Sequence, residues 1–354
     1  MEKMVNKFYK NKRILVTGAT GFKGSWLCLW LNEIGAKVYG IGYSPNKNKN
    51  LFYKLKLNKK IKYSLLDIRN LKKLKKTIKN FKPEIVFHMA AQPLIIKGYT
   101  DPFDTYTINS YGTLNILQIL KSDNKVKAII CITSDKCYKS NNSTKGFVEE
   151  DSLGGEDPYS GSKACAEIIA NTYYQSFFKN KKKCGLATVR AGNVIGGGDW
   201  SENRLIPDCI KSINSNKTII LRNPYFNRPW QHVLEPLHGY LILAKKLYEN
   251  PYKFSSGWNF GSEKNTVTDV LTVVKKIIKI WGKGKLEFKK KNKYYEQKNL
   301  QLNINKAKKN LSWKPKLSIY ESINLTVKWY KETLIHKKSP YLVTKNQIKE
   351  FLDH

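Results

Sequence analysis

The chain has 354 residues, of which 41% are hydrophobic and 12% aromatic, enough to bury the core of one large domain or two smaller ones. Its formal net charge is +37, from 64 lysines and arginines against 27 acidic residues. Only six of these basic residues are arginines, and the lysines are spread along the chain, whereas nucleic-acid sites cluster basic side chains and favour arginine. We therefore interpret the charge as a solvated, lysine-rich surface and predict no nucleic-acid partner.

Composition also argues against membrane, secreted and metal-binding proteins. No apolar run is long enough to cross a bilayer, and residues 1–13 carry charge without the apolar core of a secretory signal. The six cysteines form no C-x-x-C motif and no cysteine–histidine cluster with metal-ligand spacing. We predict a cytoplasmic protein with reduced cysteines, no membrane segment and no metal.

Apolar stretches of strand length alternate with helical patterns through the first half of the chain. Leu27, Trp30, Leu31 and Ile34 repeat with helical spacing and are followed by Gly35, a typical helix stop. The same reasoning predicts further helices over residues 71–78, 107–120 and 162–178. The expected strands are 13–18, 37–43, 61–68, 84–91, 128–134 and 185–194.

Strands that are apolar throughout and separated by helices indicate a parallel sheet covered on both faces. Right-handed crossovers then give a doubly wound α/β fold. After about residue 190 the alternation ends, and we expect shorter, irregular elements. We predict a first domain over 1–190, to which about 229–256 returns, a smaller discontinuous region over 191–335, and a loosely attached polar tail over 336–354.

The stretch VTGATGFKG places Gly18, Gly21 and Gly24 between the first strand and the first helix. Glycine at such a turn lets the backbone approach a pyrophosphate, and the helix N-terminus offers free N–H groups to the anion. This context predicts a dinucleotide site. The acid expected at the end of the second strand is absent, since Gly42, Tyr43 and Ser44 stand there, so the choice between NAD and NADP stays open.

Tyr159 and Lys163 are four residues apart on a predicted helix, so both side chains lie on one face. A nearby ammonium lowers the pKa of a phenol, which would let Tyr159 accept a hydroxyl proton while hydride leaves the same carbon. Ser134, at a strand end, would orient that hydroxyl. Asp135 and Lys136 follow directly, and an adjacent acid and base suit a reaction that also expels water.

These motifs resemble the extended short-chain dehydrogenase/reductase family, in its branch of NAD-dependent nucleotide-sugar epimerases and dehydratases. Within that branch, the Asp-Lys pair in TSDKCY and the segments HMAAQPL, DPYSGSKACAE, RAGNVIGGGDW and RPWQHVLEPL look like the members that dehydrate CDP-glucose. The resemblance covers nearly the whole chain. It implies a Rossmann-type NAD domain over 1–190, a sugar-nucleotide region over 191–335, a homo-oligomer (dimer or tetramer) and a role in making deoxysugars for a surface polysaccharide.

The resemblance also implies the site residues. Cofactor contacts are expected from Gly18, Thr20, Gly21, Phe22, Lys23, Gly24, Asp67, Ile68, Ala90, Ala91, Tyr159 and Lys163. Substrate contacts are expected from Gln92, Asn193, Trp200, Arg204, Arg228 and His232, and four of the six arginines (190, 204, 222 and 228) lie in this part of the chain. Three alternatives stay open: Asp67 as a helix cap, Arg204 in a surface ion pair, and His232 packed in the core.

The implied reaction converts CDP-glucose to its 4-keto-6-deoxy product, with Tyr159 as base at the 4-hydroxyl and Asp135 as acid at the C6 hydroxyl. Lys136 is either the base at C5 or an electrostatic partner. The competing enzyme readings are a dehydratase for another nucleotide sugar and a 4-epimerase, but an epimerase would not need Asp135 and Lys136. Outside enzymes, the alternatives are an NAD-binding sensor and a basic nucleic-acid-associated protein.

Overall fold

The computed structural model describes residues 2–43, 50–140, 146–181, 184–221, 223–263, 268–289 and 301–354. Ser44 and Arg222, which entered the sequence predictions, lie outside these ranges.

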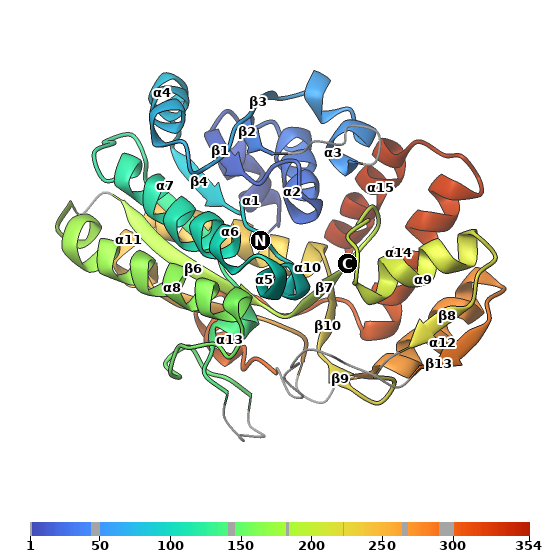
Figure 1. The fold of residues 1–354 in the computed structure, drawn as a ribbon. Helices are drawn as coiled ribbons and strands as arrows, with labels where there is room; N and C mark the ends of the chain where they lie inside the picture. Colours follow the sequence, from blue (N-terminus) through green and yellow to red (C-terminus); the bar gives the residue numbers. More distant parts are fainter. Residues whose placement is uncertain are drawn as a thin grey trace.

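A parallel sheet forms the centre of the described structure (Figure 1). It has seven strands in the order β11-β6-β5-β4-β1-β2-β3, and every neighbouring pair is parallel. The doubly wound fold is thereby confirmed. The strands are β1 (Arg13–Thr17), β2 (Lys37–Gly42), β3 (Lys62–Leu65), β4 (Ile85–His88), β5 (Ala128–Ile132), β6 (Gly185–Ala191) and β11 (Gly257–Phe260).

Helices cover both faces of this sheet because its strands carry apolar side chains on both sides. In β5, Ile130 and Ile132 belong to the core that contains helices α2 (Phe22–Glu33) and α10 (Leu234–Glu249), with α1 (Glu2–Tyr9) beside α10. Ile129 and Cys131 point the other way, into a core formed with helices α4 (Leu71–Phe81), α7 (Gly112–Leu120) and α8 (Pro158–Tyr173). This alternation is the period of two expected of a strand.

The predicted strands and long helices of the first half are confirmed, with some differences. The helix expected over 162–178 is α8 followed by a π-helical turn (Tyr174–Phe178), and the strand expected over 185–194 ends at Ala191, with a separate strand β7 (Asn193–Ile195) after it. The helix expected over 107–120 is a π-helical turn (Thr107–Tyr111) followed by α7. Several short helices had no sequence signal: α3 (Leu51–Lys54), α5 (Ile95–Thr100), α6 (Pro102–Tyr106), α11 (Pro251–Phe254) and α13 (Asn305–Leu311).

A second group of elements lies to one side of the sheet, on the right of Figure 1. It contains α9 (Leu205–Asn214), α12 (Val270–Trp281) and α14 (Ile319–Leu334), with strand β8 (Ile219–Leu221) paired to β13 (Leu286–Phe288). Two further pairs are β7 (Asn193–Ile195) with β10 (Trp230–His232) and β9 (Asn227–Arg228) with β12 (Thr268–Asp269). The expectation of shorter helices after about residue 190 is wrong, since α10 and α14 have 16 residues each.

The end of the chain is a helix, α15 (Pro340–Asp353), that packs on α2 and α14. Its apolar face buries Val343, Ile348 and Phe351. The hydroxyl of Tyr341 donates to Glu33 Oε1 at 2.8 Å. The predicted loose tail is therefore wrong, because short polar runs masked an amphipathic helix. None of the helices in the described part of the chain combines the length and apolar character that a membrane-spanning segment requires.

Candidate active site

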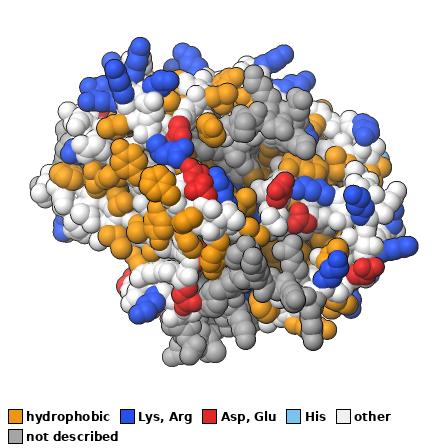
Figure 2. Space-filling view, viewed as in Figure 1, with side chains coloured by type: hydrophobic (Ala, Val, Ile, Leu, Met, Phe, Trp, Pro, Cys, Tyr) orange, Lys and Arg blue, Asp and Glu red, His pale blue; other side chains and the backbone are white. Residues whose placement is uncertain are grey.

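A cavity of about 630 Å³ opens beyond the carboxyl ends of β4, β5 and β6, and α9 and β8 form its far wall. Ligand sites of doubly wound folds lie at this edge of the sheet, because the strand order reverses there and leaves a crevice. Figure 2 shows this face of the molecule, with acidic and basic side chains gathered around its centre.

All five predicted catalytic side chains line this cavity: Ser134, Asp135, Lys136, Tyr159 and Lys163. Ser134 caps a short 3₁₀ helix over Asp135–Cys137, where the Ser134 Oγ accepts a hydrogen bond from the Lys136 N–H at 3.2 Å. The Ser134 hydroxyl donates to Asp135 Oδ1 at 2.9 Å. Lys136 Nζ lies 3.7 Å from the same carboxylate oxygen. Asp135 Oδ2 is buried and has no hydrogen-bond partner among the described residues.

Tyr159 and Lys163 enter the cavity from the first two turns of α8, whose start is capped by Asp157 and fixed by Pro158. Lys163 Nζ donates to the Ile132 carbonyl at 3.2 Å, and burial lowers the pKa of this lysine to about 8. Burial raises the pKa of Tyr159 to about 12, while a hydrogen bond with Ser134 opposes the rise. The predicted lowering of the tyrosine pKa by Lys163 is therefore wrong: desolvation of the phenolate is the larger effect.

The glycine turn between β1 and α2 has no room for side chains. A Cβ at Gly24 would lie 2.0 Å from the Gly18 carbonyl oxygen, and Gly18 itself has a φ of +71°. Phe22 and Lys23 follow the turn and line the cavity. The turn thus provides the close backbone approach that a pyrophosphate needs.

The second strand ends beside this turn, where the expected acid is missing. A Cβ at Gly42 would lie 2.4 Å from Thr20 Cγ2, so Thr20 occupies the space that a side chain at position 42 would need. The Thr20 hydroxyl in turn donates to the Tyr43 carbonyl at 3.4 Å. Crowding by Thr20 is a physical reason for glycine at position 42.

The other predicted cofactor contacts follow β3 and β4. Asp67 holds Arg69 with both carboxylate oxygens, the shortest contact being 2.6 Å, and these hydrogen bonds lower the pKa of Asp67. Helix α4 is capped by Asn70 instead, so the alternative role of Asp67 as its cap is wrong. Ile68 is buried against α7. The backbone N–H of Ala90 donates to Thr17 Oγ1 at 3.2 Å, and Ala91 lines the cavity.

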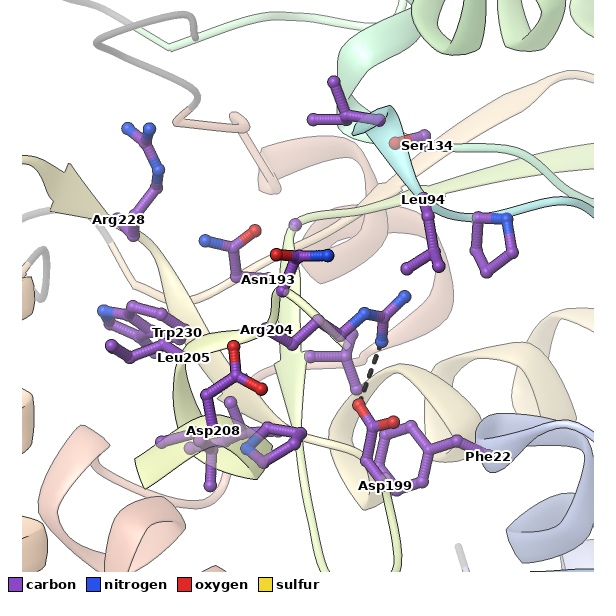
Figure 3. Close-up of a pocket in the computed structure, with 18 of the residues that line it drawn as sticks. Phe22, Leu94, Ser134, Asn193, Asp199, Arg204, Leu205, Asp208, Arg228 and Trp230 are labelled. Atoms are coloured by element: carbon purple, nitrogen blue, oxygen red, sulfur yellow. Dashed lines mark hydrogen bonds and ion pairs between the residues drawn. The ribbon is translucent and has the colours of Figure 1, made fainter. Parts of the chain in front are cut away.

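Three of the predicted substrate contacts line the cavity, namely Asn193, Arg204 and Arg228. In Figure 3, Asn193 and Arg204 lie between Ser134 and Arg228. Arg204 Nη1 contacts Asp199 Oδ2 at 3.1 Å, the dashed line of Figure 3. This acid also lines the cavity and is 4% exposed, so the ion pair of Arg204 belongs to the cavity wall.

The other three predicted substrate contacts do not line the cavity. His232 is fully buried and packs edge-on against Trp26 at 5.8 Å between ring centroids; burial lowers its pKa to about 3. Trp200 packs edge-on against Tyr330. The Gln92 amide donates to Thr105 Oγ1 at 2.8 Å. The packed arrangement of His232 matches the core alternative.

Sequence reasoning missed the far wall of the cavity. Helix α9 contributes Leu205, Asp208, Cys209 and Ser212, which repeat at the spacing of one helix face. That periodicity was available in the sequence. Nothing local, however, marks the other residues that line this side, which come from separate segments and include Ile219, Leu221, Phe226, Trp230 and Val270.

Comparison with known proteins supports the resemblance. The GDP-mannose 4,6 dehydratase family model matches residues 15–326. CDP-glucose 4,6-dehydratase of Salmonella typhimurium is 44% identical, over 99% of this chain and 99% of that protein. dTDP-D-glucose 4,6-dehydratase of Bos taurus is 26% identical, over 93% of this chain and 91% of that protein.

Solved structures show the same fold. The crystal structure of dTDP-glucose 4,6-dehydratase from Bacillus anthracis in complex with NAD has a TM-score of 0.77 at 25% identity, covering 92% of this chain and 98% of that one. UDP-glucose 4-epimerase from Thermotoga maritima has a TM-score of 0.79 at 22% identity, covering 91% and 99%. With a family model that spans most of its length and a relative that is 44% identical from end to end, this chain belongs to the GDP-mannose 4,6 dehydratase family.

Proposed function

We propose that this protein converts CDP-D-glucose to CDP-4-dehydro-6-deoxy-D-glucose and water, as an NAD-dependent hydro-lyase. The observation that carries the proposal is the convergence of Ser134, Asp135, Lys136, Tyr159 and Lys163 on one cavity. The choice of nucleotide and sugar rests on the similarity to CDP-glucose 4,6-dehydratase of Salmonella typhimurium, at 44% identity.

The glycine turn fits the cofactor. Because its glycines carry no side chains, a pyrophosphate can come close to the backbone there. Gly18, Gly21 and Gly24 would hold the pyrophosphate, and Phe22, Lys23, Ala91, Tyr159 and Lys163 would face the nicotinamide half. Asp67, Ile68, Thr20 and Ala90 remain proposed contacts on the adenosine side. When bound, NAD⁺ supplies a hydride acceptor for C4 of the sugar and afterwards the donor for C6.

The protein's own groups would then handle the protons. Ser134 orients the 4-hydroxyl and Tyr159 removes its proton. Asp135, whose Oδ2 is unpartnered among the described residues, protonates the departing C6 hydroxyl. Lys136, whose Nζ is 3.7 Å from Asp135, would remove the C5 proton and return it to C5 as hydride reaches C6. Its alternative role is to stabilise the charge of Asp135.

Arg204 and Arg228 would bind the diphosphate, because guanidinium groups form paired hydrogen bonds to phosphate oxygens. Asn193, between Ser134 and Arg228 (Figure 3), would contact the sugar. The nucleoside would lie against the α9 wall. Gln92, Trp200 and His232 do not line the cavity, and their substrate contacts stay predictions. We further propose that the NAD-binding domain and the sugar-nucleotide region divide at about residue 190. We also propose that the protein is cytoplasmic and that it makes deoxysugars for a surface polysaccharide.

The test is mass spectrometry of the purified protein incubated with NAD⁺ and, separately, CDP-, dTDP-, UDP- and GDP-linked glucose, with GDP-mannose as a fifth substrate. Loss of one water from CDP-glucose alone supports the proposal. Loss from another nucleotide sugar would move the specificity and keep the reaction. Isomerisation at C4, which leaves the mass unchanged and is detected by NMR of the sugar nucleotide, would support the 4-epimerase reading. No reaction at all would contradict an enzyme of this class.

Gly24→Ala should weaken cofactor binding. The new methyl group would lie 2.0 Å from a backbone oxygen, and overpacking of this kind costs about 1–3 kcal/mol. We expect the Kd for NAD⁺, measured by isothermal titration calorimetry, to rise about tenfold or more. Gly261→Ala is the matched control, since its Cβ would meet its nearest neighbour at an ordinary 3.4 Å. Equal NAD⁺ affinity in the two variants would contradict the assigned turn.

We also propose that the protein is a homo-oligomer that associates through the face of α6, α7 and α8. Hydrophobic side chains gather on the left of Figure 2, over these helices. Phe103 is 79% exposed and Ile168 is 54% exposed, joined by Tyr106 and Tyr111. Apolar patches of this kind mark association surfaces, and a second copy of the same helices would cover them.

Phe103→Glu together with Ile168→Glu should therefore yield monomers, because burying two carboxylates at the contact would oppose association. Analytical ultracentrifugation measures this directly. Tyr252→Glu is the control, because Tyr252 is 74% exposed on α11, outside the proposed contact. A wild-type monomer, or an unchanged oligomer in the double variant, would rule out this face.

A further inference from the structure

A buried polar network encloses the segment that carries three of the proposed catalytic residues. The segment begins at Thr133 and ends at Tyr138, with Ser134, Asp135 and Lys136 between them. The Thr133 hydroxyl donates to Glu167 Oε1 at 2.5 Å. At the other end, Arg190 Nη1 donates to the Tyr138 hydroxyl at 2.7 Å. Both ends are thus attached to the same pair of side chains, Glu167 and Arg190.

Glu167 and Arg190 form a two-contact ion pair. Arg190 Nε donates to Glu167 Oε1 at 2.9 Å and Nη2 donates to Oε2 at 2.8 Å. The side chains are 3% and 5% exposed, respectively. Burial alone would raise the pKa of Glu167, but Arg190 and the hydroxyl donors more than reverse this effect, so its pKa is lowered. The charged, fully hydrogen-bonded pair holds a single geometry, since guanidinium and carboxylate meet as two rigid forks.

The network also reaches the helix that carries the proposed base. Glu167 is on α8 one turn beyond Lys163 and two turns beyond Tyr159, on the same side of the helix. Its contacts with Thr133 and Arg190 therefore tie α8 to the ends of β5 and β6. Ser134 follows β5 by two residues and Tyr159 is on α8, so this tie links the two elements that carry them.

Buried ion pairs add little net stability compared with apolar side chains of similar volume. The contribution of this pair is to positioning, because its two contacts fix α8, which carries Glu167, relative to β6, which carries Arg190. We propose that Glu167 and Arg190 are positioning residues. Acting through Thr133 and Tyr138, they hold the side chains of Ser134 and Asp135 at a fixed distance and orientation relative to Tyr159. This inference rests on the proposed function of the cavity, but neither charged residue is assigned a contact with substrate.

The test compares two threonines that donate to the same carboxylate. Thr133 bonds Glu167 Oε1 and Thr188 bonds Oε2 at 2.6 Å, and each is 6% exposed. Thr133 adjoins Ser134, whereas Thr188 is on β6, outside the catalytic segment. Replacing either by valine keeps the shape and removes one hydroxyl. The backbone N–H of Thr133 still donates to the Val189 carbonyl at 2.9 Å, so the strand stays attached.

Thr133→Val should lower kcat about tenfold or more, with KM for CDP-glucose within about twofold, because small displacements of catalytic groups slow chemistry more than binding. Thr188→Val should change kcat by less than about threefold, although both variants lose a hydroxyl donor to Glu167. Thr133→Val also loses a longer contact of that hydroxyl with the Val189 carbonyl at 3.1 Å. Thr133→Ser, which retains the hydroxyl, should recover most of the rate. Equal losses of kcat in the two valine variants would overturn the proposal.

Crystal structures of both valine variants provide a readout that needs no activity. We expect Ser134 and Asp135 to shift relative to Tyr159 in Thr133→Val and to stay in place in Thr188→Val. An unmoved segment in Thr133→Val would overturn the positioning role. A wild-type protein that dehydrates no nucleotide sugar would instead contradict the proposed function, and the structural comparison would still decide the role of the network.

Discussion

Tyr159→Phe is expected to slow the dehydration of CDP-glucose by about a hundredfold to ten-thousandfold, the range that general acid–base groups contribute. The substitution removes only the hydroxyl, so the cavity keeps its shape and KM should change little. In the proposed reaction this phenol, which lines the cavity and forms a hydrogen bond with Ser134, takes the 4-hydroxyl proton. Without it, oxidation at C4 has no base, and the first step of the cycle should fail.

Rapid mixing that follows the absorbance of the reduced nicotinamide measures this first step. Tyr173→Phe is the matched control, because Tyr173 lies on the same helix and its hydroxyl donates to Gln118 at 2.8 Å. We expect the control to oxidise substrate at the wild-type rate. Wild-type oxidation by Tyr159→Phe would mean that another group is the base.

Asp135→Asn should separate the oxidation step from the loss of water. The amide keeps an oxygen that can accept from the Ser134 hydroxyl, now at 2.9 Å from Asp135 Oδ1, so the sugar should still be oxidised. It cannot act as the acid at the C6 hydroxyl, and turnover should fall about a hundredfold or more. Reduced nicotinamide should then accumulate on the enzyme, since no acceptor forms at C6.

Absorbance reports that accumulation, and mass spectrometry reports whether water is lost. Asp123→Asn is the control, since Asp123 lies in the turn after α7 and only accepts from the Lys125 N–H. Normal turnover in Asp135→Asn would contradict its role as the acid. Loss of both oxidation and dehydration would assign Asp135 to the first step along with Tyr159.

The sequence by itself was sufficient for features that depend on near neighbours. The apolar run of β5 is local, because the strand period involves residues within a few positions. The glycine turn and the four-residue spacing of Tyr159 and Lys163 are equally local. These patterns determined the doubly wound fold and the five residues that line the catalytic end of the cavity.

Burial and long-range contacts were decided only by the tertiary structure. Desolvation by burial raises the pKa of Tyr159, although its helical neighbour Lys163 alone would lower it. His232 packs against Trp26, and α15 packs against α2. No local sequence pattern predicts either contact. Glu167 meets Thr133 and Arg190, 34 and 23 residues away in the chain. Such contacts exist only once the sheet is assembled, because side chains from separate strands and helices then share one interior without water.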